Sequence, residues 1–171
     1  MTVEREAISN IVKEREHMQQ TEMIADQLER AYRGDAWYGP SVRAALEDVD
    51  AAMAAARPRA EAHSIHEIVL HMTAWTREVT RRLRAGIARD PEMGDWPAAD
   101  GEWDAAVAAL DAAHAELLAA IRAQDPALLD ERIGDQRNRA LGSGVSRYVT
   151  LHGLVQHHAY HAGQISLLKK G

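Results

Sequence analysis

Residues 151–170 read LHGLVQHHAYHAGQISLLKK, a stretch in which leucines and histidines recur at helical spacing. At about 100° per residue, three apolar side chains fall within about 40° of His161: Leu154, Ile165 and Leu168. His161 is therefore expected to face the core of the protein. His157 lies about 40° to one side of it and His158 about 60° to the other, so both remain candidates for the buried side of this helix.

The composition extends this helical reading to the whole chain. Apolar residues make up 46% of the 171 residues, whereas aromatic residues make up only 5% and Phe is missing. Alanine and leucine supply most of the apolar content, and both favour helix over strand. Because β-branched residues and Tyr are thinly spread, a sheet is not expected. The length fits one domain with a sizeable core, so we predict a single all-α domain.

Helical periodicity recurs at residues 3–33, 41–56, 65–88 and 102–124, and the last helix is expected over 145–170. Gly34 is a helix terminator, and Ser64 with Glu67 three residues later is typical of a capping box. Trp96 and Trp103 are expected to pin the loop between the third and fourth helices to the body. Residues 125–144 are expected to be irregular. Four core helices with a long N-terminal extension predict a four-helix bundle.

Charge and cysteine content exclude several classes of protein. The formal net charge is −6, which disfavours nucleic-acid binding, and the arginines near residues 77–84 are interpreted as a solvated helix end. The chain has no cysteine, so disulfides, cysteine-ligated metals and a cysteine nucleophile are excluded. No apolar run approaches the roughly 18 residues of a membrane span, and the charged first residues do not resemble a signal peptide. We expect a soluble, cytoplasmic protein.

Histidine spacing points to a metal site in the bundle. His157 and His161 are four residues apart, the spacing at which two imidazoles on one helix can hold one ion, and His158 with His161 is the i, i+3 alternative. His71 is the best third donor, because it shares a helix face with apolar neighbours. His114 is a reserve candidate, expected to pack in the core. The remaining histidines are expected at the surface: His17, His63, His66 and His152.

Three neutral imidazoles suit a divalent metal, with Zn²⁺ the first choice and Ni²⁺ or Fe²⁺ as alternatives. Such a site leaves a coordination position open for water or substrate. The Glu-x-x-His repeats of di-iron bundles are not found: Glu67 and His71 are four residues apart and the pair does not recur.

Three segments resemble the DinB/YfiT-like superfamily. The last helix is similar to the family's C-terminal signature, in which His-x-x-x-His is followed closely by Gly-Gln. HSIHEIVLHMTAW at 63–75 resembles its second motif, a histidine shortly before a tryptophan, and GDAWYGPSVRAAL at 34–46 resembles the first connection in one branch. The resemblance covers residues 21–171 and leaves 1–20 as an N-terminal helical extension.

The resemblance implies an up-down-down-up four-helix bundle that forms a homodimer and holds a divalent metal. Its three metal-binding histidines fall on His71, His157 and His161, which selects His157 over His158. His158 departs from the polar residues usual at its position, and with Gln164 it is a candidate for the shell around the metal ligands.

The family resemblance implies a small-molecule substrate and several candidate functions. Characterised relatives include enzymes that use a low-molecular-weight thiol, so the first hypothesis is a metal-dependent thiol S-transferase. The alternatives are a metal-dependent hydrolase and a non-catalytic metal-binding stress-response bundle. Binding of DNA, suggested by the family's name alone, conflicts with the acidic charge.

Overall fold

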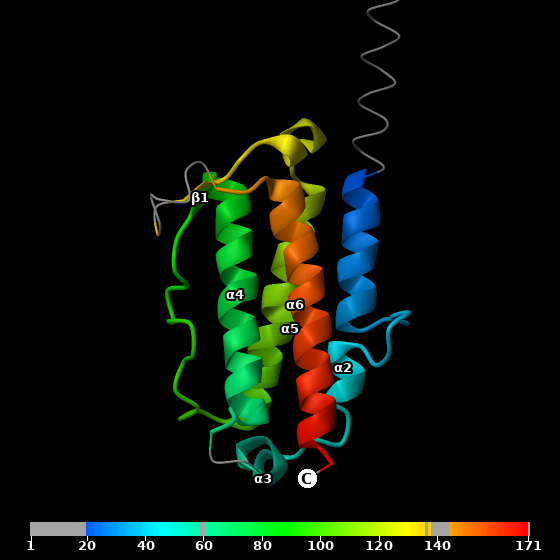
Figure 1. The fold of residues 1–171 in the computed structure, drawn as a ribbon, viewed down its shortest axis with the longest axis vertical. Coiled ribbons are helices and arrows are strands. Elements are labelled where there is room, and N and C mark those ends of the chain that lie inside the picture. Colours follow the sequence, from blue (N-terminus) through cyan, green and yellow to red (C-terminus); the bar gives the residue numbers. More distant parts are fainter. Residues whose placement is uncertain (1–19, 59–60, 136, 138–143, 171) are drawn as a thin grey trace, which may run out of the picture.

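Four long helices lie side by side in the computed structural model (Figure 1), which describes residues 20–58, 61–135, 137 and 144–170. They are residues 20–32, α4 (Ile65–Ala85), α5 (Trp103–Arg122) and α6 (Arg147–Leu168). The first helix and α6 run in one direction, and α4 and α5 run in the other (Figure 1). The predicted all-α, up-down-down-up bundle is therefore confirmed.

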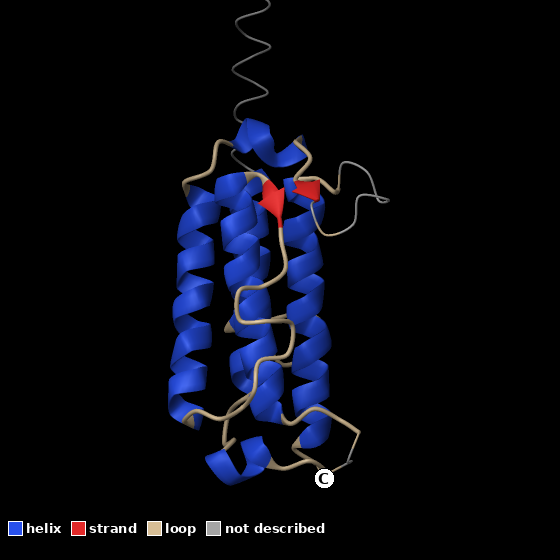
Figure 2. Ribbon diagram, turned by 90° about the vertical axis from the view of Figure 1, so that its left-hand side faces the viewer, coloured by secondary structure: helices blue, strands red, loops and turns tan. Residues whose placement is uncertain are grey.

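The connection between α4 and α5 is long because these two helices are parallel. Residues 89–102 run the length of the bundle, along its outer face, before α5 begins (Figure 2). Two short strands, β1 (Ile87–Ala88) and β2 (Gly134–Asp135), pair in parallel at the end where α4 finishes. The 3-10 helix η1 (Pro126–Asp130) precedes β2 in the connection to α6.

The helix predicted over 41–56 is wrong as a single element. It is divided into α2 (Val42–Ala45) and α3 (Ala51–Ala55), with Asp48 in the left-handed conformation at φ 60° between them. The side chain of Asp50 accepts a hydrogen bond from the Met53 N–H at 2.8 Å and so caps α3. Aspartate competes for backbone donors in this way, which favours a new helix start over a continuous helix.

The ends of α4 follow from local chemistry. The capping box is confirmed: Ser64 accepts from the Glu67 N–H, and the Glu67 carboxylate accepts from the Ser64 N–H. The helix ends at Ala85, three residues before the predicted end, because Gly86 takes the left-handed conformation at φ 67°. The part of the first predicted helix before residue 20, and with it residues 1–19 of the predicted N-terminal extension, lies outside the described residues.

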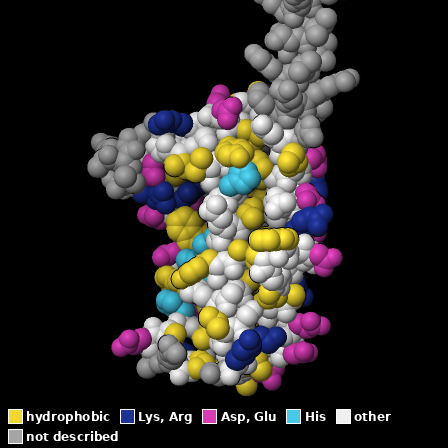
Figure 3. Space-filling model, turned by 45° about the vertical axis from the view of Figure 1, so that its right-hand side comes forward, with side chains coloured by type: hydrophobic (Ala, Val, Ile, Leu, Met, Phe, Trp, Pro, Cys, Tyr) yellow, Lys and Arg dark blue, Asp and Glu magenta, His cyan; other side chains and the backbone are white. Residues whose placement is uncertain are grey.

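One face of the molecule mixes histidine and hydrophobic side chains, with acidic and basic side chains around them (Figure 3). Among the described helices, none is both long and apolar enough to cross a membrane. The division of the chain at residue 20 and the homodimer both stay predictions.

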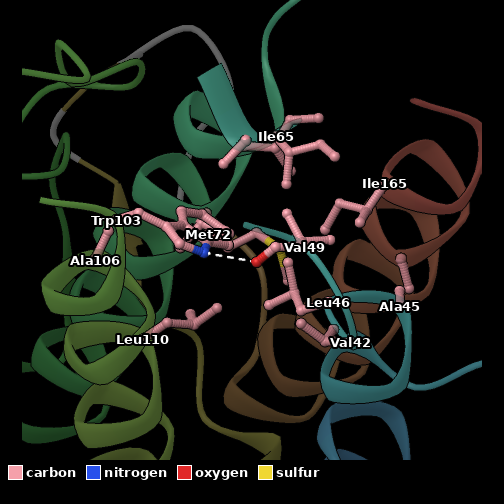
Figure 4. Close-up of a cluster of buried hydrophobic side chains, with 14 of the residues drawn as sticks. Val42, Ala45, Leu46, Val49, Ile65, Met72, Trp103, Ala106, Leu110 and Ile165 are labelled. Atoms are coloured by element: carbon pink, nitrogen blue, oxygen red, sulfur yellow. Dashed lines mark hydrogen bonds between the residues drawn. The ribbon is translucent and has the colours of Figure 1, made fainter. Parts of the chain in front are cut away.

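The core consists of two hydrophobic clusters stacked along the bundle axis. One surrounds Met72, Leu110 and Ile165 and is closed by Trp103, whose indole N–H donates to the Val49 carbonyl at 2.9 Å (Figure 4). The other contains apolar residues from the opposite ends of the same helices. Between them lie buried polar side chains at the middle of the bundle: Thr76, His114, His158 and His161. The candidate functional site lies at this height along the bundle axis, between the two hydrophobic clusters.

Candidate metal centre

Three histidines from two helices converge at the middle of the bundle. His71 comes from α4, while His157 and His161 are one turn apart on α6. The Nε2 atom of His157 lies 3.0 Å from Nε2 of His71 and 3.0 Å from Nε2 of His161. His71 and His161 are buried, and His157 is half-buried. The structure thus brings together the three histidines that the sequence singled out.

In His71 and His161, the ring nitrogen Nδ1, which points away from the cluster, has a hydrogen-bond acceptor. This acceptor determines which ring nitrogen carries the hydrogen. Nδ1 of His71 donates to the Asp95 carbonyl oxygen at 2.6 Å, and Nδ1 of His161 donates to Oε1 of Gln164 at 2.7 Å. Because a carbonyl oxygen only accepts, each neutral ring carries its lone pair on Nε2. Both lone pairs point at His157, whose Nε2 carries at most one hydrogen.

The environment keeps all three rings neutral. Burial lowers the pKa of His71 below its ordinary value. Burial, followed by the proximity of His161 and His71, lowers the pKa of His157 to about 3. Burial also lowers the pKa of His161 to about 4, against the opposing effect of its hydrogen bond to Gln164. At neutral pH the cluster therefore presents unprotonated imidazoles, the form that binds metals.

The cluster fits a divalent cation. Nε2 of His157 can donate only one hydrogen, so it can form a hydrogen bond with only one of the two lone pairs that lie 3.0 Å from it. A cation at the centre could bind both. Two nitrogens that bind one zinc ion tetrahedrally, each at 2.0–2.1 Å, lie about 3.3 Å apart, close to the observed spacing. Nδ1 atoms held by a carbonyl and an amide are the outer contacts usual for metal-binding histidines. The ligand nitrogens of the three imidazoles all lie within 4.8 Å of one another and could therefore hold one metal ion.

The loop between α4 and α5 covers one side of the cluster. Asp95 reaches His71 with its carbonyl group, and its carboxylate accepts from the Trp75 indole N–H at 2.6 Å. The indole of Trp96 stacks on the His71 ring with centroids 3.9 Å apart. The expected pinning of this loop by its tryptophans is confirmed. Asp95 could not be identified from the sequence, because a loop residue has no periodicity that would place it.

An open cleft adjoins the histidines. A hollow of about 490 Å³ lies over the cluster, and its lining includes Trp96, Tyr160 and His161. The same three residues line a larger hollow of about 730 Å³ next to it. Gln164 also lines the larger hollow, and its amide group donates to the Tyr160 hydroxyl at 3.0 Å. A small molecule in this cleft could reach the open side of the cluster.

His158 and His114 lie deeper in the bundle than the cluster. His158 is fully buried, with Nε2 3.4 Å from the Thr76 hydroxyl and Nδ1 without a hydrogen-bond partner. Burial lowers its pKa to about 3. His114 stacks on Tyr32 with centroids 3.9 Å apart, and its Nε2 lies 2.9 Å from a Glu29 carboxylate oxygen. His114 therefore packs in the core as expected.

The expectation that His66 lies at the surface is wrong. This residue is only 6% exposed, because Trp103 at the start of α5 packs edge-on against its ring. His63 is half-buried, stacked on Trp96 at 3.5 Å, and His152 is half-buried beside Tyr148. His17 lies outside the described residues.

The interpretation of the arginines near residues 77–84 as a solvated helix end holds for Arg77 and Arg84, which are exposed, but is wrong for Arg82. Arg82 is only 7% exposed, and its Nε donates to the buried carboxylate of Glu78 at 2.9 Å. The Glu78 carboxylate also accepts from Arg81 and from the Arg89 backbone N–H. These contacts tie the end of α4 to the segment that follows β1.

The sequence model of the DinB superfamily matches residues 40–165, which include α4, α5, nearly all of α6 and all three clustered histidines. No curated protein and no solved structure matches the chain.

Proposed function

Since the chain belongs to the DinB superfamily, we propose that it is a metal-dependent enzyme whose three clustered histidines hold a divalent cation. The reaction we propose is the transfer of a low-molecular-weight thiol to an electrophile. The observation that carries the proposal is the convergence of three neutral imidazoles on the floor of an open cleft, with Nε2 of His157 3.0 Å from Nε2 of His71 and 3.0 Å from Nε2 of His161.

The number of protein ligands supports a reactive site over a purely structural one. Structural zinc sites are normally closed by four protein ligands, whereas catalytic sites keep a position open. Among the described residues, no fourth histidine or carboxylate belongs to the group formed by His71, His157 and His161. Zinc is the first choice of metal for an all-imidazole site, with nickel and iron as alternatives.

A bound divalent metal lowers the pKa of a thiol and favours its nucleophilic thiolate form. The sulfur belongs to a second substrate, because the chain contains no cysteine. Residues of the protein supply orientation: Asp95 and Gln164 hold the rings of His71 and His161, and Trp96 shields one side of the cluster from water. Tyr160 and Gln164 are placed to contact a substrate in the cleft.

The test is conjugation of cellular thiols to a chlorinated aromatic electrophile by the purified, zinc-loaded chain. In this reaction a carbon–sulfur bond forms and the carbon–chlorine bond breaks. Chloride leaves with the bonding electrons, and the thiol proton passes to solvent. We expect chloride release that depends on enzyme, thiol and metal, and that is abolished by a chelator and restored by added zinc.

The outcome also separates the alternatives. If the loaded chain releases no chloride with any thiol, the transferase proposal is wrong. Ester or amide cleavage by the same preparation would then favour a hydrolase, in which a metal activates water. A chain that holds metal but turns over neither class of substrate would favour the non-catalytic bundle.

A further inference from the structure

The groove between α4 and α6 extends beyond the histidine cluster in both directions. Towards the start of α4 it opens into the larger hollow, which we call the mixed arm, lined in part by Glu61, His63, Gln164 and Lys170. Towards the end of α4 lies a second hollow of about 270 Å³, which we call the apolar arm. Its lining includes Trp75, Val79, Val149, Gly153, Leu154 and His157.

Both arms meet at the cluster. Trp75 and His157 line the apolar arm and also the hollow over the histidines. On the other side, Trp96, Tyr160 and His161 are shared by that hollow and the mixed arm. A molecule in the apolar arm therefore touches His157, and a molecule in the mixed arm touches His161. Two substrates can approach the cluster from opposite ends of one groove.

The chemistry of the two arms differs. The mixed arm offers a carboxylate, an ammonium group, an amide and a hydroxyl. The lining of the apolar arm has no carboxylate, and its one cationic side chain, Arg82, is paired with Glu78 at 2.9 Å and lies over the Trp75 ring. Such a pocket favours an uncharged hydrocarbon group over a charged one, since a charge would lose hydration without gaining a free partner.

We propose that the apolar arm binds the uncharged aromatic or short aliphatic group of the electrophile, while the polar thiol takes the mixed arm. The assignment of the two substrates rests on the proposed function. The binding of a hydrocarbon group in the apolar arm does not rest on the proposed function, because it depends only on the residues that line this arm.

Two glycines of α6 provide a matched test. A Cβ atom added at Gly153 or at Gly163 meets no atom within 4 Å, and both positions are exposed. Gly153 lines the apolar arm, whereas Gly163 lines none of the hollows described above. Replacement of either by leucine gives the same gain in helix propensity, about 0.8–1 kcal/mol. Gly153→Leu therefore fills the arm, and Gly163→Leu controls for the change in helix stability.

The probe is fluorobenzene, an unreactive aromatic whose binding to the full chain is followed by ¹⁹F NMR line broadening, with and without zinc. We expect wild type and Gly163→Leu to bind it equally, and Gly153→Leu to bind it about tenfold or more weakly. Val149→Asp, which places a charge at a half-exposed position of the arm, should weaken binding similarly. No binding by wild type, or equal binding by wild type and both arm variants, would overturn the proposal.

A kinetic measurement then separates this proposal from the proposed function. If thiol transfer occurs, Gly153→Leu should raise the KM for an apolar electrophile and leave the KM for the thiol unchanged. A raised KM for the thiol instead would overturn the assignment of the arms. If fluorobenzene binds as expected and no thiol is transferred, the apolar site stands and the transferase proposal fails.

Discussion

The opposing hydrogen bonds of His71 and His161 are the residue-level feature that defines the site. Each ring gives its Nδ1 hydrogen to an oxygen outside the cluster, at 2.6 Å and 2.7 Å, and turns a lone pair inward. Of the two acceptors, Asp95 contributes its backbone carbonyl, and its carboxylate lies 3.3 Å from the same Nδ1 atom of His71, so a side-chain replacement would remove only the second contact. Gln164 contributes a side-chain amide and can be removed.

Gln164→Leu should weaken zinc binding by about 10- to 100-fold, the usual cost of losing an outer contact of a metal-binding histidine. Gln164→Glu, which keeps an acceptor for the His161 hydrogen, should retain tight binding. Isothermal titration with zinc measures both. Gln156→Leu, at an exposed position of the same helix, is the matched control. Unchanged affinity in Gln164→Leu would show that this contact does not orient His161.

Sequence reasoning could place the three histidines and name Gln164, which contacts His161, but it could not identify the loop residues around them. Helix geometry left His157 and His158 open, and only the family resemblance selected His157. In the structure His157 faces the groove between α4 and α6, whereas His158 points to Thr76 inside the bundle. Asp95 and Trp96 come from an irregular loop, whose path depends on tertiary contacts and not on periodicity. That the histidines bind a metal stays a prediction.

At the scale of elements, periodicity predicted the long helices well because each buries one continuous face. It failed at 41–56, where the local hydrogen bond of Asp50 starts a new helix within an apolar pattern. At the end of α4 the arginines suggested solvent exposure, which holds for Arg77 and Arg84 but not for Arg82. There the buried carboxylate of Glu78 accepts from Arg81, Arg82 and the Arg89 backbone.

Glu78→Gln should destabilise the protein by about 3 kcal/mol, because it leaves the buried Arg82 guanidinium without its anionic partner. The comparison is Glu116→Gln, which removes an exposed ion pair with Arg84 and should cost less than about 1 kcal/mol. Urea denaturation of both variants gives the free energies of unfolding. Equal losses in the two variants would mean that the Glu78 network does not hold the end of α4.

At the scale of the whole molecule, the cluster links the antiparallel helices α4 and α6 across the polar middle of the bundle. The pKa of His157 is about 3 and that of His161 about 4 in the folded chain, against an ordinary value of 6.5. Below pH 6.5 the unfolded chain therefore binds more protons than the folded chain. The contribution to stability is fully present above pH 6.5 and is lost as the pH falls towards 4 and 3.

Chelator-treated full chain should accordingly unfold at a lower urea concentration at pH 5 than at pH 8. In His157→Gln this difference should shrink, because one titrating group with a lowered pKa is gone. The range from pH 5 to pH 8 lies above the ordinary pKa of carboxyl groups, so the histidines dominate the change in stability between these two pH values. A midpoint that is unchanged or higher at pH 5 would contradict the neutral, buried state of the cluster.

The most direct test of the metal centre is the content of bound divalent metal in the purified full chain and its variants. We expect one ion per chain in wild type, and a large loss of metal in His71→Ala, His157→Ala and His161→Ala. The control is His158→Leu. His158 is buried next to the cluster but does not belong to it, and leucine has a similar volume, so this variant should retain the wild-type metal content. Wild-type metal content in all three alanine variants would contradict the account.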